Sequence, residues 1–228
     1  MATRNYISVT PLADLLDSRA EMHPDRDAIA FPTARYTYRE LADRVQATAK
    51  SLLALGVDKG DRVGYFLHES VDTITTLMAA AKIGAIAVPV NSRFKSVELR
   101  QVIVHCGMKV IVTSRPGGGS DFAALLLETF PGIGAGETGS ELIVEDAPEL
   151  RWVVVLEDEA LPGMIDRDTF LGLGAEVDDA AVLHRQQAVR VRDTAVIMYT
   201  SGTTAMPKGA MISHEAFARF AASSKLSA

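Results

Sequence analysis

Short apolar runs alternate with amphipathic stretches through the first half of the chain. In each amphipathic stretch, apolar residues recur at helical spacing after a residue that can cap a helix. The clearest sign of a helix start is the capping box formed by Thr37 and Glu40. Other runs are apolar at nearly every position, which predicts strands buried on both faces: 28–31, 63–67, 86–90 and 109–112. This β-α-β-α-β order predicts an α/β fold with a parallel, helix-covered sheet.

The second half of the chain is less regular. Glycine-rich segments at about 114–120 and 131–140 show no apolar period, and we expect both to be flexible loops. The stretch 178–192 is mixed and predicts no single element. The remaining pattern predicts helices at 121–130 and 165–173, and strands at 152–156, 194–198 and 210–213.

Composition narrows the class of protein. The chain has 228 residues, of which 48% are hydrophobic, so it can bury a sizeable core. A net charge of −6 with no long basic run argues against nucleic acid as a main partner. The single cysteine, Cys106, excludes an internal disulfide and is interpreted as a small buried hydrophobe.

Targeting signals are also absent from the sequence. It has no apolar run long enough to cross a membrane and no basic-then-apolar start, so we expect the cytoplasm. The tripeptide Ser224-Lys225-Leu226 looks like a peroxisomal address, but that address must be terminal and two residues follow it here.

Candidate chemistry gathers in one stretch, Tyr-Thr-Ser-Gly-Thr-Thr-Ala-Met-Pro-Lys-Gly, at 199–209. Gly202 allows backbone N–H groups to approach an anion closely, and Lys208 adds a positive charge on a flexible stem. Hydroxyl donors come from Thr200, Ser201, Thr203 and Thr204. The alternative is a solvated turn. A Walker loop is excluded because Pro207 and Gly209 flank the lysine and a strand follows.

The stretch resembles the phosphate-binding signature of the adenylate-forming superfamily, in which the pattern is Tyr-Thr-Ser-Gly-Thr-Thr-Gly-x-Pro-Lys-Gly. The one departure is Ala205, where the family has glycine. Three further stretches resemble patterns of the same superfamily: Tyr36 to Leu41, Gly56 to Val63 and Lys82 to Asn91. The resemblance as a whole is strongest to the acyl- and aryl-CoA synthetase branch and covers about 12–112 and 151–212. The chain is therefore expected to form the first part of the large N-terminal domain of such an enzyme.

The resemblance implies a ligase that joins a carboxylic acid to CoA at the expense of ATP, in two steps, with fatty acids among the acids this branch uses. Lys208 is the residue expected to act in catalysis, and the segment Thr200 to Thr204 with Lys208 would hold the β- and γ-phosphates. Mg²⁺ would bridge phosphate oxygens and keep most of its waters, so no protein ligand is predicted for it. None of the five histidines has a partner at metal-ligand spacing, and His214 is expected to be a helix-start residue near the surface.

Other parts of the family pattern are not found after Lys208: the adenine-binding and ribose-binding residues, the hinge, and the lysine of the small C-terminal domain. We therefore expect a fragment, inactive by itself, spanning 1–228 without that small domain. Two alternatives stay open. The fragment can belong to an amino-acid adenylation or luciferase-like enzyme. It can also be a truncated non-catalytic protein that self-associates as a homo-oligomer.

Overall fold

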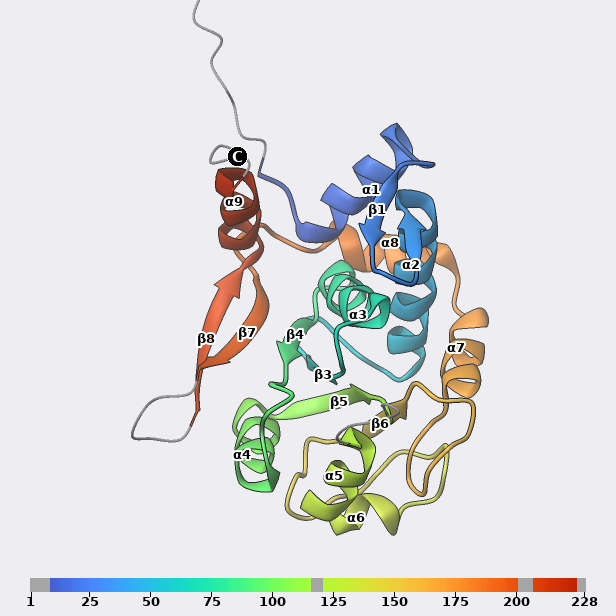
Figure 1. Ribbon diagram of the computed structural model, residues 1–228, viewed down its shortest axis with the longest axis vertical. Helices are drawn as coiled ribbons and strands as arrows, with labels where there is room; N and C mark the ends of the chain where they lie inside the picture. Colours follow the sequence, from blue (N-terminus) through green and yellow to red (C-terminus); the bar gives the residue numbers. More distant parts are fainter. Residues whose placement is uncertain (1–8, 116–120, 201–206, 225–228) are drawn as a thin grey trace, which may run out of the picture.

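A six-stranded sheet runs through the computed structural model, which describes residues 9–115, 121–200 and 207–224 (Figure 1). The strands lie in the order β6-β5-β3-β4-β7-β8. Their bounds are β3 Arg62–Phe66, β4 Ile86–Pro89, β5 Met108–Thr113, β6 Trp152–Val155, β7 Thr194–Thr200 and β8 Lys208–Ser213. A separate antiparallel pair, β1 Asp27–Ala30 and β2 Arg35–Thr37, precedes the first long helix.

Helices cover both faces of the sheet. On one side lie α1 Leu12–Met22, α2 Tyr38–Ala54, α3 Val71–Lys82, α7 Arg167–Ala175 and α8 Asp179–Gln187. On the other lie α4 Ser96–Cys106, α5 Phe122–Thr129 and the short α6 Pro131–Gly134. The last helix, α9 His214–Ser224, follows β8 directly, lies beside the end of the sheet and contacts α1 (Figure 1).

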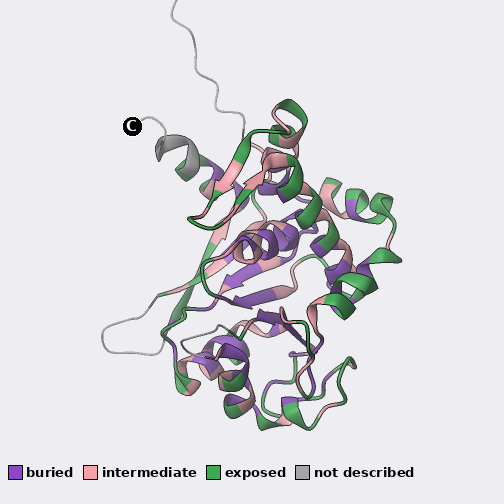
Figure 2. Cartoon of the chain, turned by 45° about the vertical axis from the view of Figure 1, so that its right-hand side comes forward, coloured by how far each residue is buried: buried purple, intermediate pink, exposed green. Residues whose placement is uncertain are grey.

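The core divides between the two faces because parallel strands bury both of their sides. Along β5, Val110 and Val112 face the cluster under α1, α2 and α3, whereas Met108 and Ile111 face the cluster under α4 and α5. Figure 2 shows these strands as buried ribbon between half-exposed helices. The predicted helix-covered α/β sheet is confirmed, and it is parallel from β6 to β7.

Strand β8 departs from the parallel sheet that we predicted. It runs antiparallel to β7, with Thr194 paired to Ser213 at one end and Thr200 paired to Lys208 at the other. Only seven residues separate the two strands, which is too few for the crossover that a parallel pair requires. A hairpin is the connection that such a short segment allows.

The prediction of a flexible loop over 131–140 is wrong at its start. Pro131 begins the short helix α6, as proline does at a first helical position. Ile133 is fully buried against the α5 side of the core, so a single apolar residue anchors a segment that has no apolar period. The other predicted loop lies partly in 116–120, outside the described residues.

The mixed stretch 178–192 contains helix α8. Asp178 caps it by accepting from the Ala180 amide, and Val182 is its one fully buried side chain. A helix that buries a single residue leaves almost no periodic signal in the sequence.

Candidate functional site

The β7–β8 hairpin carries the two ends of the predicted phosphate-binding stretch. Strand register places Tyr199 opposite Gly209 and Thr200 opposite Lys208. The two predicted binding residues that the structure describes, Thr200 and Lys208, therefore lie side by side where the strands separate, and both are exposed. The predicted Ser201, Gly202, Thr203 and Thr204, together with Ala205, lie outside the described residues.

Lys208 is an uncompensated charge in this part of the protein. Its ammonium forms no ion pair with any described residue, whereas four other lysines, at 50, 59, 82 and 109, are paired with carboxylates. A lysine without an ion pair, opposite an exposed threonine at the end of a hairpin, can bind an anionic oxygen without first breaking a salt bridge within the described part of the protein. These two side chains therefore fit a phosphate group.

Tyr199 joins this hairpin to helix α4. Its hydroxyl lies 2.7 Å from His105 Nδ1, and the two rings meet edge to face with centroids 5.8 Å apart. Across the hairpin, a Cβ on Gly209 would lie 3.1 Å from Cζ of the tyrosine ring and 2.9 Å from Cγ2 of Ile197. Glycine thus leaves room for the ring over β8. Nothing in the sequence linked His105 to Tyr199, because 94 residues separate them.

Burial controls the protonation of the groups around Tyr199. It raises the pKa of the Tyr199 hydroxyl to about 12, with a smaller contribution from Cys106. It also raises the pKa of the Cys106 thiol to about 11, against a weaker opposing effect of Arg62. Cys106 therefore stays a thiol at neutral pH and lacks the thiolate that a nucleophile needs.

The base of the hairpin is closed by His214, the first residue of α9. Its side chain is 0% exposed, and Nδ1 accepts a hydrogen bond of 3.3 Å from the Leu12 amide at the start of α1. Backbone bonds from His214 to Asp193 and from Glu215 to Val191 hold the start of α9 against the segment before β7. The prediction that His214 lies near the surface is wrong, because α1 covers it.

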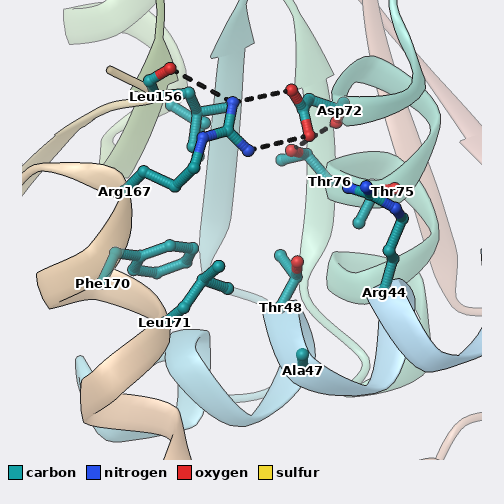
Figure 3. A pocket seen from close by; sticks show the side chains of 11 residues that line it. Arg44, Ala47, Thr48, Asp72, Thr75, Thr76, Leu156, Arg167, Phe170 and Leu171 are labelled. Carbon is teal, nitrogen blue, oxygen red and sulfur yellow. Dashed lines mark hydrogen bonds and ion pairs between the residues drawn. The ribbon is translucent and has the colours of Figure 1, made fainter. Parts of the chain in front are cut away.

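A second concave site lies between α2, α3 and α7 (Figure 3). It is a cavity of about 70 Å³ whose walls include Phe170 and Leu171. The Arg167 guanidinium bonds Asp72 at 3.0 and 3.4 Å beside it, which ties α7 to α3. The hydroxyl of Thr75, also in the lining, has no hydrogen-bond partner among the described residues. No residue of the hairpin lines this cavity.

Two further findings concern the described residues only. Their His, Cys, Asp and Glu side chains form no group of three that could hold a metal ion. None of the helices that the structure describes combines the length and the apolar character needed to span a bilayer.

Comparisons with known proteins identify the family of the chain. Residues 16–228 match the family model described as AMP-binding enzyme. The mitochondrial medium-chain acyl-CoA ligase ACSF2 of Mus musculus is 31% identical over 215 residues, which are 93% of this chain and 35% of the relative. The chain thus spans about a third of the length of the curated relatives it matches.

Solved structures share the fold. The anthranilate CoA ligase AuaEII, solved with anthranoyl-AMP, superposes with a TM-score of 0.72 at 22% identity, over 94% of this chain and 37% of that one. The inhibitor-bound N-terminal domain of FACL13 from Mycobacterium tuberculosis gives a TM-score of 0.65 at 28% identity, over 90% of this chain and 44% of that one. The mostly parallel sheet is that of the N-terminal domain of adenylate-forming enzymes. The chain belongs to the AMP-binding enzyme family, and its matches among acyl-CoA synthetases and ligases correspond to an N-terminal portion of those proteins.

Proposed function

We propose that this chain is the N-terminal, phosphate-binding part of an ATP-dependent acyl- or aryl-CoA ligase. The observation that carries the proposal is the register of the hairpin, which sets Thr200 and Lys208, both exposed, at directly opposite positions, with Lys208 in no ion pair among the described residues. The relatives named as a medium-chain acyl-CoA ligase and an anthranilate CoA ligase support a carboxylic acid and CoA as the other substrates.

The proposed reaction has two steps. A carboxylate oxygen bonds to the α-phosphorus of ATP as the bond to the leaving pyrophosphate breaks. The thiolate of CoA then attacks the acyl carbonyl carbon, the thioester forms, and AMP leaves. In the first step Lys208 would offset negative charge on the β- and γ-phosphates, and the Thr200 hydroxyl would donate to one of their oxygens.

The chain's own residues prepare this site by holding it in place. Tyr199 packs over Gly209 and bonds His105, so the strand ends that carry Thr200 and Lys208 are attached to α4. Ser201, Gly202, Thr203 and Thr204 are proposed to complete the phosphate contacts. Mg²⁺, when bound with the triphosphate, supplies further positive charge; we assign none of the described residues to it.

The 228-residue chain is proposed to make no acyl-adenylate alone, because the adenine and ribose contacts of the family pattern are not found in it. Acid-dependent exchange of pyrophosphate into ATP tests this proposal. We expect no exchange from the chain by itself with fatty, aromatic or amino acids. Clear exchange by the purified chain would contradict the proposal.

A longer form that continues past Ala228 tests the choice of reaction. Exchange that depends on a fatty or aromatic acid, followed by a CoA thioester, supports the ligase. Exchange that depends on an amino acid without a thioester supports an amino-acid adenylation domain. Light or an oxidised product from a bound acid supports a luciferase-like enzyme.

A second candidate role, self-association without catalysis, is favoured by the exposed edge of β8. Met211 is 70% exposed on this edge strand, and no charged residue follows Lys208 until Glu215. Apart from Lys208 at its start, β8 has no charged residue, and an edge strand without charges along its length is a template for pairing with another chain. Antiparallel pairing of two copies of β8 would place their Lys208 side chains at opposite ends and avoid repulsion. Light scattering of the chain and of Met211→Lys tests this role; a monomeric wild-type chain would exclude it.

A further inference from the structure

His214 is a buried titratable residue that connects the base of the hairpin to helix α1. The ring lies at the junction of β8 and α9, and Leu12 is the first residue of α1, 202 positions earlier. Through this bond, the N-terminal helix is attached to the strand that begins at Lys208.

The bond requires a neutral imidazole. The Leu12 amide donates to Nδ1, so Nδ1 must carry a lone pair and the proton of the neutral ring lies on Nε2. Nε2 is itself buried without a hydrogen-bond partner among the described residues. A second proton would convert Nδ1 from an acceptor into a donor facing another donor. The imidazolium would then have no accepting partner at either nitrogen.

Two carboxylates near the ring could offset such a charge, but other donors already bind them. Asp193 accepts from Lys59 Nζ at 2.6 Å and from the Arg190 amide at 2.8 Å. Asp14, on α1, accepts from Gln186 at 2.7 Å. Both carboxylates therefore have partners that protonation of His214 would not remove.

Charges on the other elements packed here do not favour the imidazolium. Lys59 opposes it directly, and Lys208 lies at the far end of β8. On α9 itself, Glu215 is paired with Arg219. Burial has the largest effect and lowers the pKa of His214, while Asp193 and Asp14 oppose that shift less strongly.

We propose that neutral His214 is a positioning residue that fastens the β7–β8 hairpin to α1, and that its protonation loosens this attachment. The hairpin's role as a phosphate-binding element rests on the proposed function, but the attachment itself does not. Acidification would free the base of the hairpin first, because the bond to Leu12 is lost there, while the central strands β3 and β5 stay formed.

The lowered pKa of His214 determines whether acid stabilises or destabilises the fold. The unfolded chain titrates His214 near the ordinary value of about 6.5, and the folded chain titrates it lower. The stability that the neutral ring contributes is therefore complete above about pH 6.5 and is lost as pH falls through the folded value. Within that window the unfolding constant gains up to about tenfold per pH unit from this one proton.

Hydrogen exchange of the 228-residue chain without nucleotide tests the proposal. Wild type is compared with His214→Asn, whose amide oxygen can accept from the Leu12 amide without titrating, and with the exposed His184→Asn as the matched control. Between about pH 7 and pH 5, we expect protection of Leu12 and of β8 to fall in wild type and in His184→Asn, by no more than the roughly tenfold per pH unit that one proton allows. Protection should stay nearly constant in His214→Asn, and β3 and β5 should not differ between the three proteins.

Equal pH dependence of the Leu12 amide in wild type and His214→Asn would overturn the proposal. If His214→Asn fails to fold, nuclear magnetic resonance of the wild-type imidazole decides: a ring that titrates at about 6.5 or above would also overturn it, and a lower value would support it. Because no nucleotide is present, a negative result here leaves the proposed phosphate contacts of Thr200 and Lys208 untouched.

Discussion

His105 Nδ1 lies 2.7 Å from the hydroxyl of Tyr199, so the last turn of α4 fixes the end of β7 immediately before Thr200. This bond joins two segments that are 94 residues apart in the sequence. A hairpin that projects past its neighbouring strands needs such an attachment, because β4 pairs with β7 through only one register position, Ala87 with Val196. Tyr199 supplies this attachment at the end of the hairpin that carries Thr200 and Lys208.

Replacing Tyr199 with phenylalanine should remove the bond to His105 while keeping the ring over Gly209. We expect the free energy of unfolding to fall by about 0.5–1.5 kcal/mol, the usual net value of one hydrogen bond. Urea denaturation at pH 7 measures it. Tyr36→Phe is the control, because the Tyr36 ring lies under Arg44 and its hydroxyl bonds no described residue; its value should stay within about 0.5 kcal/mol of wild type.

The same variant reports the ionisation of Tyr199. In the folded protein the pKa of the Tyr199 hydroxyl is raised to about 12, so folding favours the neutral phenol. The stability that the neutral phenol contributes is present below about pH 10 and is lost as the pH rises toward 12. The difference in tyrosinate absorbance between wild type and Tyr199→Phe should therefore appear only well above pH 10. A difference that titrates at pH 10 or below would show that the hydroxyl is not buried as described.

Gly209→Ala should damage the hairpin through packing. The new Cβ would lie 2.9 Å from Ile197 Cγ2 and 3.1 Å from the Tyr199 ring, both shorter than a normal contact. We expect a loss of about 1–3 kcal/mol as the ring is displaced. Gly172→Ala is the matched control, since its Cβ would meet nothing within 4 Å and it lies in helix α7; it should stabilise by about 0.5–1 kcal/mol. Equal melting shifts for the two variants would refute this explanation.

Local signals in the sequence were sufficient to predict most elements. The capping box of Thr37 and Glu40 is present, with both of its hydrogen bonds. Gly56 and Gly84 follow helices with φ of 72° and 78°, a left-handed backbone in which glycine has no Cβ penalty. Each signal acts within about one helical turn, so it can be read without knowledge of the fold.

Contacts between distant segments could not be predicted in this way. Lys82 belongs to a stretch that resembles the family, but the sequence does not show that its ammonium binds the carboxylate of Asp17, 65 residues earlier. His214 was placed near the surface because its cover, Leu12, lies 202 residues away. The sequence predicts which stretch of residues forms the candidate site. The strand register that pairs Thr200 with Lys208 can be seen only in the structure.

Lys82→Ala should destabilise the fold. Lys82 is 5% exposed, and its ammonium lies 2.8 Å from both oxygens of Asp17, which ties α3 to α1. Removing it leaves the carboxylate with the Gln186 amide as its one side-chain partner among the described residues. We expect a loss of about 1–3 kcal/mol, less than for a fully buried pair because the Asp17 side chain that remains is 30% exposed and can be solvated.

A double-mutant cycle checks the cause of that loss. Lys82→Met with Asp17→Leu replaces both charges by apolar groups and should recover much of the stability, because no buried charge is then left without its partner. Arg39→Ala, whose pair with Asp25 is exposed, is the control and should cost less than about 1 kcal/mol. A coupling energy near zero would show that packing of the lysine stem, and not the pair, accounts for the effect.

Lys208→Ala should weaken binding of the triphosphate while leaving the fold intact. Lys208 is exposed and unpaired among the described residues, so its removal should change the free energy of unfolding by no more than about 0.5 kcal/mol. In a longer form that adenylates an acid, loss of this charge should lower the rate of adenylation about 10²–10³-fold, the usual effect of removing one donor to developing charge. Lys95→Ala, another exposed lysine without an ion pair among these residues, should leave the rate unchanged. Rates are measured by pyrophosphate exchange beside a melting curve. If Lys208→Ala and Lys95→Ala slow the reaction equally, general surface charge and not the pairing of Lys208 with Thr200 is responsible; if Lys208→Ala unfolds the chain, the lysine is structural.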